Sequence, residues 1–76
     1  MQQKPSSIFP ERLDYIIQIR GSSNEKLAQL LFLSPTTISG YRNGRRYPDL
    51  DVFCDLCRFL NVSPDYLLGL SDEFPL

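Results

Sequence analysis

The apolar residues of this chain recur at spacings of three and four, which predicts helices, and no stretch alternates as a strand does. One such series occupies residues 13–17 and follows Pro10. Proline at the first position of a helix loses no hydrogen bond that the helix needs. The first helix is therefore predicted to run from Pro10 to Arg20.

A serine followed by a helix-compatible residue marks the start of the next two helices. Ser23 is suited to cap the amides of a helix at about Asn24–Leu31. Ser34 stands before a proline, which repeats the start signal, and Gly44 supplies a left-handed stop. These signals predict a third helix from Pro35 to about Asn43.

The remaining helices are marked in the same way. Pro48 is predicted to open a fourth helix, whose apolar residues again recur at spacings of three and four, and Asn61 ends it. Ser63 and the proline after it predict a short fifth helix, Pro64–Leu68, which Gly69 closes.

These elements predict an all-α fold of five helices in a single small domain. A chain of 76 residues buries only about 60% of the surface that its unfolded form exposes, so the core must be compact. We expect a flexible N-terminal arm at residues 1–9, the helical domain at 10–70 and a C-terminal tail at 71–76.

The formal net charge of −1 conceals an uneven distribution along the chain. From Arg20 to Tyr47 there are five basic residues and one acidic residue, whereas from Pro48 to Leu76 there are one basic and six acidic residues. The basic middle could bind a polyanion, from which the acidic end would face away.

Several classes of function are excluded or disfavoured by composition. The chain has no histidine, so it contains no Ser-His or Cys-His pair for nucleophilic catalysis. Cys54 and Cys57 are too few for a disulfide framework, and no metal or other cofactor site is predicted. The longest apolar run has four residues, which predicts no membrane span. We expect a cytoplasmic protein that is not an enzyme and has no evident small-molecule substrate.

The second and third helices are separated by only three residues, Phe32 to Ser34, so they must cross at a steep angle. Apolar residues fall where such a pair needs contacts between its helices, and Ala28 stands where the helices come closest. This is the geometry of a helix-turn-helix unit.

The stretch from Glu11 to Asp72 resembles the XRE family, DNA-binding domains similar to lambda-type repressors and Cro proteins. The resemblance is carried by motifs along the whole stretch: Glu11-Arg12-Leu13, Arg20-Gly21, Leu27-Ala28-Gln29-Leu30-Leu31, Ser34 with Thr37-Ile38-Ser39, Tyr41, Gly44-Arg45-Arg46-Tyr47-Pro48-Asp49-Leu50, Asn61-Val62-Ser63 and Asp65-Tyr66-Leu67-Leu68-Gly69. It implies a lambda-repressor-like five-helix bundle whose third helix enters the major groove, usually in a dimer on a pseudo-palindromic operator.

The resemblance also implies a set of DNA-binding residues. Asn24 matches a position that touches a phosphate, the third helix reads base edges, and the loop after it follows the phosphate backbone. The predicted DNA-binding residues are Asn24, Ser34, Pro35, Thr36, Thr37, Ser39, Gly40, Arg42, Asn43, Arg45 and Arg46. Because few of those on the third helix offer good hydrogen bonds to bases, groove shape is expected to contribute to specificity.

The chain departs from the family pattern at three places. Phe32 opens the turn where the family commonly has glycine, so a steric cost is expected there. Ile17 and Arg42 replace a pair that bridges the first and third helices in many members, which leaves Arg42 free to reach DNA. Ser22 stands where leucine is usual, and Ile19 where a polar residue is typical. Apart from these departures, Gly40 lies inside a helix, for which close approach to DNA is the favoured explanation.

The sequence therefore predicts a sequence-specific transcriptional regulator that binds double-stranded DNA as a homodimer, a repressor of phage or mobile-element type. The alternative is a protein-interaction module on the same fold, resembling an antitoxin or antirepressor. The net charge of −1 and the scarcity of polar base-reading residues favour that alternative.

Overall fold

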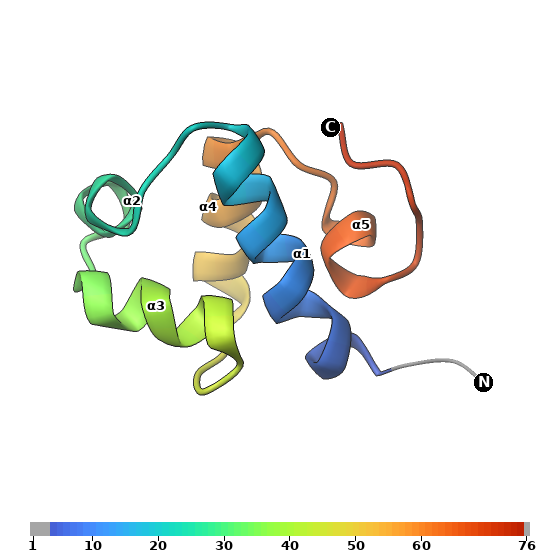
Figure 1. Ribbon diagram of the computed structural model, residues 1–76, viewed down its shortest axis with the longest axis horizontal. Coiled ribbons are helices and arrows are strands. Elements are labelled where there is room, and N and C mark those ends of the chain that lie inside the picture. The colour runs from blue at the N-terminus through green and yellow to red at the C-terminus, as the bar shows by residue number, and fades with distance from the viewer. Residues whose placement is uncertain (1–3, 76) are drawn as a thin grey trace.

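The computed structural model describes residues 4–75, within which it contains five helices. They are α1 (Pro5–Ile19), α2 (Asn24–Leu31), α3 (Pro35–Asn43), α4 (Leu50–Leu60) and α5 (Pro64–Leu68). Figure 1 shows α1 crossing the middle of the molecule, with α2 and α3 to one side of it and α5 to the other. The predicted all-α class and the number of helices are confirmed.

Side-chain caps set the starts of the helices after α1. The Ser23 hydroxyl accepts the Lys26 amide at 3.1 Å, and Ser34 does the same for the Thr37 amide at 3.2 Å. The predicted bounds of α2, α3 and α5 are confirmed. The predicted start of the fourth helix is wrong, because Asp49 caps the helix and Pro48 lies before that cap.

The first helix begins at Pro5, five positions before the predicted start. Pro5 takes the first helical position and Pro10 lies inside the helix, where it has no amide hydrogen to donate to the Ser6 carbonyl one turn earlier. The Tyr47 hydroxyl donates to that carbonyl instead, at 2.6 Å. The helix therefore continues through its proline, and Phe9 is buried in the core.

The two ends of the described chain are more ordered than the sequence predicted. Residues 5–9 of the expected flexible arm belong to α1. In the expected tail, the Phe74 carbonyl accepts the Ser63 amide at 2.7 Å, and the Phe74 ring meets Tyr66 edge-on at 5.4 Å. Residues 1–3 and 76 lie outside the described residues, and the division of the chain at residues 9 and 70 stays a prediction.

One apolar core joins all five helices. The contact predicted between α2 and α3 is present, because Leu27, Ala28, Ile38 and Tyr41 are all buried. Two leucines of the helices do not face this core: Leu30 on α2 is 43% exposed, and Leu50 at the start of α4 is 82% exposed. Within the described chain, no helix is both long and apolar enough to span a membrane.

Candidate nucleic-acid interface

The turn between α2 and α3 brings the two helices together at the predicted place. Phe32 ends α2 with φ 58° and ψ 43°, the left-handed conformation in which glycine is usual. The next amide, of Leu33, donates to the Ala28 carbonyl at 2.8 Å, which closes the helix end. The expected strain at Phe32 is confirmed, and its side chain is 95% exposed.

The start of α3 presents small polar side chains to solvent. Ser34, Pro35 and Thr36 are exposed, whereas Thr37 and Ser39 are half-buried. The Ser34 hydroxyl caps the helix and lies 3.0 Å from the Thr37 hydroxyl, so both groups are already engaged within the turn. Thr36 is therefore the exposed hydroxyl on this face that has no such role in the described structure.

Gly40 was predicted to lie on the exposed face of α3, but it is buried. A Cβ atom at this position would come within 3.1 Å of Cγ of Arg46, and the Gly40 carbonyl accepts the amides of both Arg45 and Arg46. The loop after α3 folds back onto this glycine. Close packing of the Arg46 side chain accounts for glycine at position 40, and close approach of Gly40 to DNA stays a prediction.

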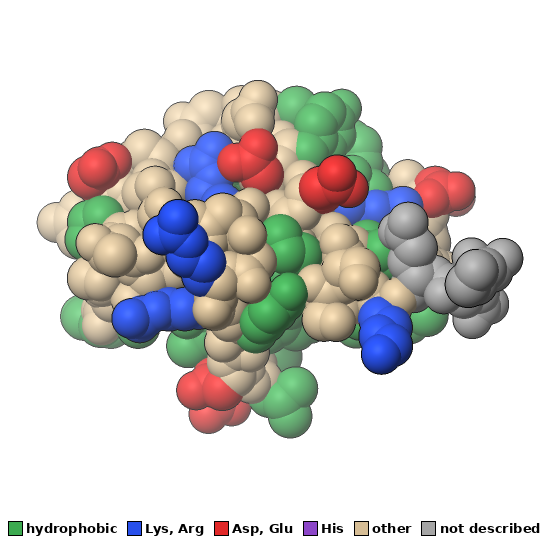
Figure 2. Space-filling view, turned by 60° about the horizontal axis from the view of Figure 1, so that its bottom comes forward, with side chains coloured by type: hydrophobic (Ala, Val, Ile, Leu, Met, Phe, Trp, Pro, Cys, Tyr) green, Lys and Arg blue, Asp and Glu red, His purple; other side chains and the backbone are tan. Residues whose placement is uncertain are grey.

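The loop after α3 carries the basic side chains that remain available. The Asn43 side-chain oxygen accepts the Arg45 amide at 3.1 Å and so shapes the loop. Arg45 and Arg46 are exposed, and neither guanidinium forms a salt bridge within residues 4–75. Figure 2 shows basic side chains over this part of the surface, beside a strip of apolar ones.

Arg42 was predicted to be free of contacts within the protein, but its guanidinium group is bound to α1 and α2. Its Nε lies 2.7 Å from Oδ1 of Asp14, and its Nη1 donates to Oδ1 of Asn24 at 2.8 Å. A salt bridge between α1 and α3 is therefore present, although the sequence predicted its loss. The acidic residue lies on α1 and the arginine on α3, the reverse of the arrangement in many family members. Gln18 supports the bridge by donating to the other Asp14 oxygen at 2.6 Å.

Asp14 and Gln18 belong to the contact around Arg42, although neither was predicted from the sequence to do so. Asp14 lies three residues before Ile17 on α1, and thus on the same face of that helix. An acidic residue at that spacing, together with an arginine where many family members have an acid, was the signal that could have revealed the pair. The contact joins residues 28 positions apart, so no local pattern contains it.

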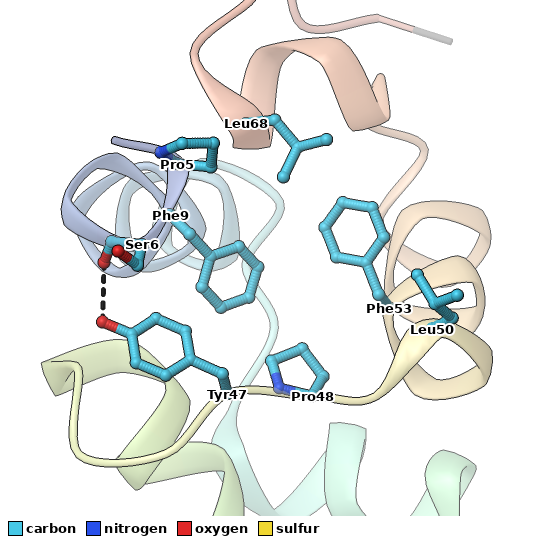
Figure 3. A pocket seen from close by; sticks show the side chains of 8 residues that line it. All are labelled: Pro5, Ser6, Phe9, Tyr47, Pro48, Leu50, Phe53 and Leu68. Carbon is cyan, nitrogen blue, oxygen red and sulfur yellow. Dashed lines mark hydrogen bonds between the residues drawn. The ribbon is translucent and has the colours of Figure 1, made fainter. Parts of the chain in front are cut away.

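An apolar groove lies beside the basic loop, between the start of α1, the start of α4 and the end of α5. Figure 3 shows Phe9 at its centre, between Tyr47 and Phe53, with Leu50 and Leu68 at its edges. The groove has a volume of about 340 Å³. The Tyr47 hydroxyl donates to the Ser6 carbonyl on α1, and the centre of its ring lies 6.1 Å from that of Phe9.

The cysteines form no metal site in the described chain. No group of three or more histidine, cysteine, aspartate or glutamate side chains is placed to hold a metal ion there. Cys57 is buried in the core, as expected of a small apolar residue, and Cys54 is exposed. Burial, followed by the nearby Cys54 thiol, raises the pKa of Cys57 to about 11. A thiol with so high a pKa stays protonated and unreactive at neutral pH.

Comparison with known proteins matches the chain to a family. The helix-turn-helix family model HTH_3 covers residues 15–67, a range that includes α2, the turn and α3. The chain is 30% identical over 66 residues to the uncharacterized HTH-type transcriptional regulator YobD of Bacillus subtilis (strain 168). It is 36% identical over 63 residues to the HTH-type transcriptional regulator ImmR of the same organism.

A third relative is the HTH-type transcriptional activator BcrR of Enterococcus faecalis, which is 31% identical over 61 residues. The aligned regions cover 80–87% of this chain but only 59%, 49% and 30% of YobD, ImmR and BcrR, respectively. The chain therefore corresponds to one part of each of these proteins. All three are named as regulators of transcription and none as an enzyme, which agrees with the predicted lack of catalysis.

Proposed function

Because the chain belongs to the XRE family of helix-turn-helix proteins, we propose that it is a transcriptional regulator that binds double-stranded DNA sequence-specifically. The observation that carries the proposal is the arrangement of α3 and its loop, in which Thr36 and the two arginines Arg45 and Arg46 are exposed together. The arginines would bind phosphates, and α3 would read the major groove.

The predicted DNA-binding residues take two roles in this proposal. Asn24, Asn43, Arg45 and Arg46 fix the position of the protein on the phosphate backbone, which supplies affinity for any sequence. Ser34, Pro35, Thr36, Thr37 and Ser39 lie along the face of α3 that would enter the groove. Because this face has few hydrogen-bonding groups, specificity relies partly on the shape and deformability of the operator.

We propose repression as the mode of regulation, of the phage or mobile-element type. A domain that occupies its operator can block transcription by its bulk alone, without contacting another protein. One relative is named as an activator, so activation is the competing outcome. A reporter gene placed behind the selected operator separates the two, because expression falls under repression and rises under activation.

Salt dependence of DNA binding tests the proposed phosphate contacts. Wild-type protein should bind a mixed-sequence duplex weakly and less tightly as salt increases. Arg45→Ala should weaken binding to every sequence and lower the salt slope by about one. Arg58→Ala is the matched control, because Arg58 is an exposed arginine on α4 and its loss should leave both values unchanged.

Selection of bound duplexes from a random pool tests specificity. Thr36→Ala should change which sequences are enriched, with little effect on binding to mixed sequence. If neither Thr36→Ala nor Arg45→Ala differs from wild type, the proposed face is wrong. If the wild type shows no salt-sensitive binding at all, the protein-interaction alternative is supported instead.

A homodimer on a pseudo-palindromic operator is part of the proposal, with the apolar groove as its contact surface. Leu50 is 82% exposed at the rim of this groove, so a two-fold axis beside it would place each Leu50 in the groove of the other copy. The groove shares Tyr47 with the basic loop, so this surface is continuous with the proposed DNA face.

The dimer has its own test. Leu50→Asp should weaken self-association in sedimentation, whereas Leu70→Asp should not, because Leu70 is 72% exposed and does not line the groove. Half-sites separated by about one helical turn in the selected duplexes would support a dimer. A wild type that stays monomeric both free and on the selected operator would contradict it.

A further inference from the structure

The guanidinium group of Arg42 joins three helices at one point. It is held on α3 and contacts Asp14 on α1 through Nε and Asn24 on α2 through Nη1. Gln18 fixes the Asp14 carboxylate from one turn further along α1. The Arg42 side chain is only 22% exposed, so these contacts lie at the edge of the core and not out in solvent.

This contact determines which way the Asn24 amide points. Arginine has donors and no acceptor, so the Asn24 atom that faces it must be the oxygen. The Asn24 nitrogen, with its two donors, is then directed away from Arg42. Within residues 4–75 that nitrogen donates no hydrogen bond to another residue, although Asn24 is half-buried.

We propose that Arg42 is a positioning residue, which orients the Asn24 amide for its phosphate and does not bind DNA itself. This inference rests on the proposed function, since it assigns a role within the same DNA face. Asp14 is part of the device, because it fixes the guanidinium from the side opposite Asn24. The charges of Asp14 and Arg42 cancel, so the pair as a whole adds no net charge to the proposed DNA face.

A double-mutant cycle with Asn24→Ala and Arg42→Gln tests the coupling, with affinity for a mixed-sequence duplex as the measurement. Arg42→Gln alone should weaken binding by about tenfold, the loss expected when one oriented hydrogen bond to an ion is removed. In the Asn24→Ala protein, Arg42→Gln should have a much smaller effect than in the wild type. Independent effects that simply add would overturn the proposal.

The salt slope separates positioning from direct contact. If Arg42 only positions Asn24, Arg42→Gln leaves the slope unchanged, as Arg58→Ala does. If Arg42 itself binds a phosphate, Arg42→Gln lowers the slope by about one, as Arg45→Ala does, and the proposal is wrong.

Asp14→Asn gives the sharpest result, because a pure charge effect and a positioning role predict opposite changes in DNA affinity. Removal of a negative charge near DNA should strengthen binding if charge alone matters. If Asp14 acts by holding Arg42 on Asn24, the same substitution weakens binding. Equal or tighter binding of Asp14→Asn overturns the proposal.

Each variant is first checked for folding by circular dichroism and urea unfolding. If Arg42→Gln has lost its structure, the Arg42→Lys variant is used in its place. Lysine keeps the charge but cannot hold both partners with one planar group, so its affinity should also fall. The side-chain amide signals of Asn24 in the NMR spectrum of the free protein should shift in Arg42→Gln, and unchanged signals would contradict the proposal.

Failure of this inference is distinguishable from failure of the proposed function. Salt-sensitive binding by the wild type with an additive cycle rejects the role of Arg42 and leaves the DNA-binding function intact. A wild type that does not bind duplex DNA rejects both.

Discussion

Arginines on two sides of this molecule have opposite surroundings. Near α5 and the C-terminal segment, Arg12 and Arg20 are bound to the protein. Arg12 donates to the carbonyls of Tyr66 and Ser71 at 2.7 and 2.6 Å, and Arg20 contacts the carbonyl of Leu60 at 2.8 Å. In the loop after α3, Arg45 and Arg46 extend into solvent.

The difference has a physical cause in the ends of the helices. The last carbonyls of a helix have no partner within it, and a guanidinium group supplies several donors at once. Leu60 ends α4, and Arg20 satisfies its carbonyl. The Tyr66 carbonyl, in the last turn of α5, accepts the Gly69 amide and also Arg12. Arginines that count equally toward the net charge therefore either stabilise the fold through such contacts or remain exposed to solvent.

This changes the meaning of the basic middle of the chain. Of its five basic residues, Arg20 is bound to the end of α4 and Arg42 to Asp14. Lys26, Arg45 and Arg46 remain for an anionic partner. The charge available to DNA is therefore smaller than the sequence suggested, and we expect only a modest affinity for mixed-sequence DNA.

The largest expected effect is on the bound side. Arg12→Ala removes both carbonyl contacts, the pair with Asp72 and the stacking on Tyr66, so the free energy of unfolding should fall by about 2 to 3 kcal/mol. Urea unfolding measures it. Arg45→Ala should stay within about 0.5 kcal/mol of wild type, and equal losses in the two variants would refute the comparison.

High pH tests the buried thiol of the core. The Cys57 thiol titrates near 9 when unfolded and at about 11 when folded, because burial disfavours the thiolate. The unfolded state therefore releases its proton first, and stability should fall by up to about 1.4 kcal/mol per pH unit between these values. Burial likewise raises the pKa of Tyr41, followed in effect by Asp49, and adds to the loss.

Cys57→Ala is the control for that measurement. Its unfolding free energy should be lower at neutral pH, because a buried sulfur is removed, but it should fall less steeply at alkaline pH. An identical pH dependence in both proteins would mean that Cys57 is not the group responsible.

A smaller effect is expected at the strained turn on the exposed side. Phe32→Gly should raise the free energy of unfolding by about 1 kcal/mol, since the left-handed conformation disfavours a side chain and this one is 95% exposed. Thermal and urea unfolding measure the change. Phe32→Ala, which keeps a Cβ atom, should gain much less, and equal gains would point away from backbone strain.

The smallest stability change is expected at Gly40, where the effect on DNA binding is the more informative one. Gly40→Ala favours the helix by under about 1 kcal/mol, but its methyl group must move the Arg46 side chain by a few tenths of an ångström. Stability should be close to that of the wild type while affinity for duplex DNA changes. Unchanged affinity would show that the packing of Arg46 on Gly40 is irrelevant to binding.

The parts of the fold that could be predicted are those with local signals. The bounds of α3 and α5 follow from a serine cap and a glycine stop within a few residues of each other, and the start of α2 follows from its serine cap. The start of α1 could not be obtained in this way, because the residue that supports Pro10 inside the helix is Tyr47, far along the chain.

The candidate site divides in the same manner. The helix-turn-helix contact was predictable because its apolar spacing lies within one stretch of chain. The state of Arg42 depends on Asp14, and that of Gly40 on the path of the loop, and both required knowledge of how distant segments meet. Spacing identified which face is presented, whereas tertiary contacts decided which side chains on it are available.

The hydrogen bond from Tyr47 to the Ser6 carbonyl makes positions 10 and 47 depend on each other, so we expect them to vary together in evolution. With alanine in place of Pro10, the helix would satisfy that carbonyl from within, and the carbonyl would no longer depend on the tyrosine hydroxyl. With phenylalanine in place of Tyr47, the carbonyl would be left to water. Among natural variants of this protein, proline and tyrosine at these positions should accordingly appear together and disappear together.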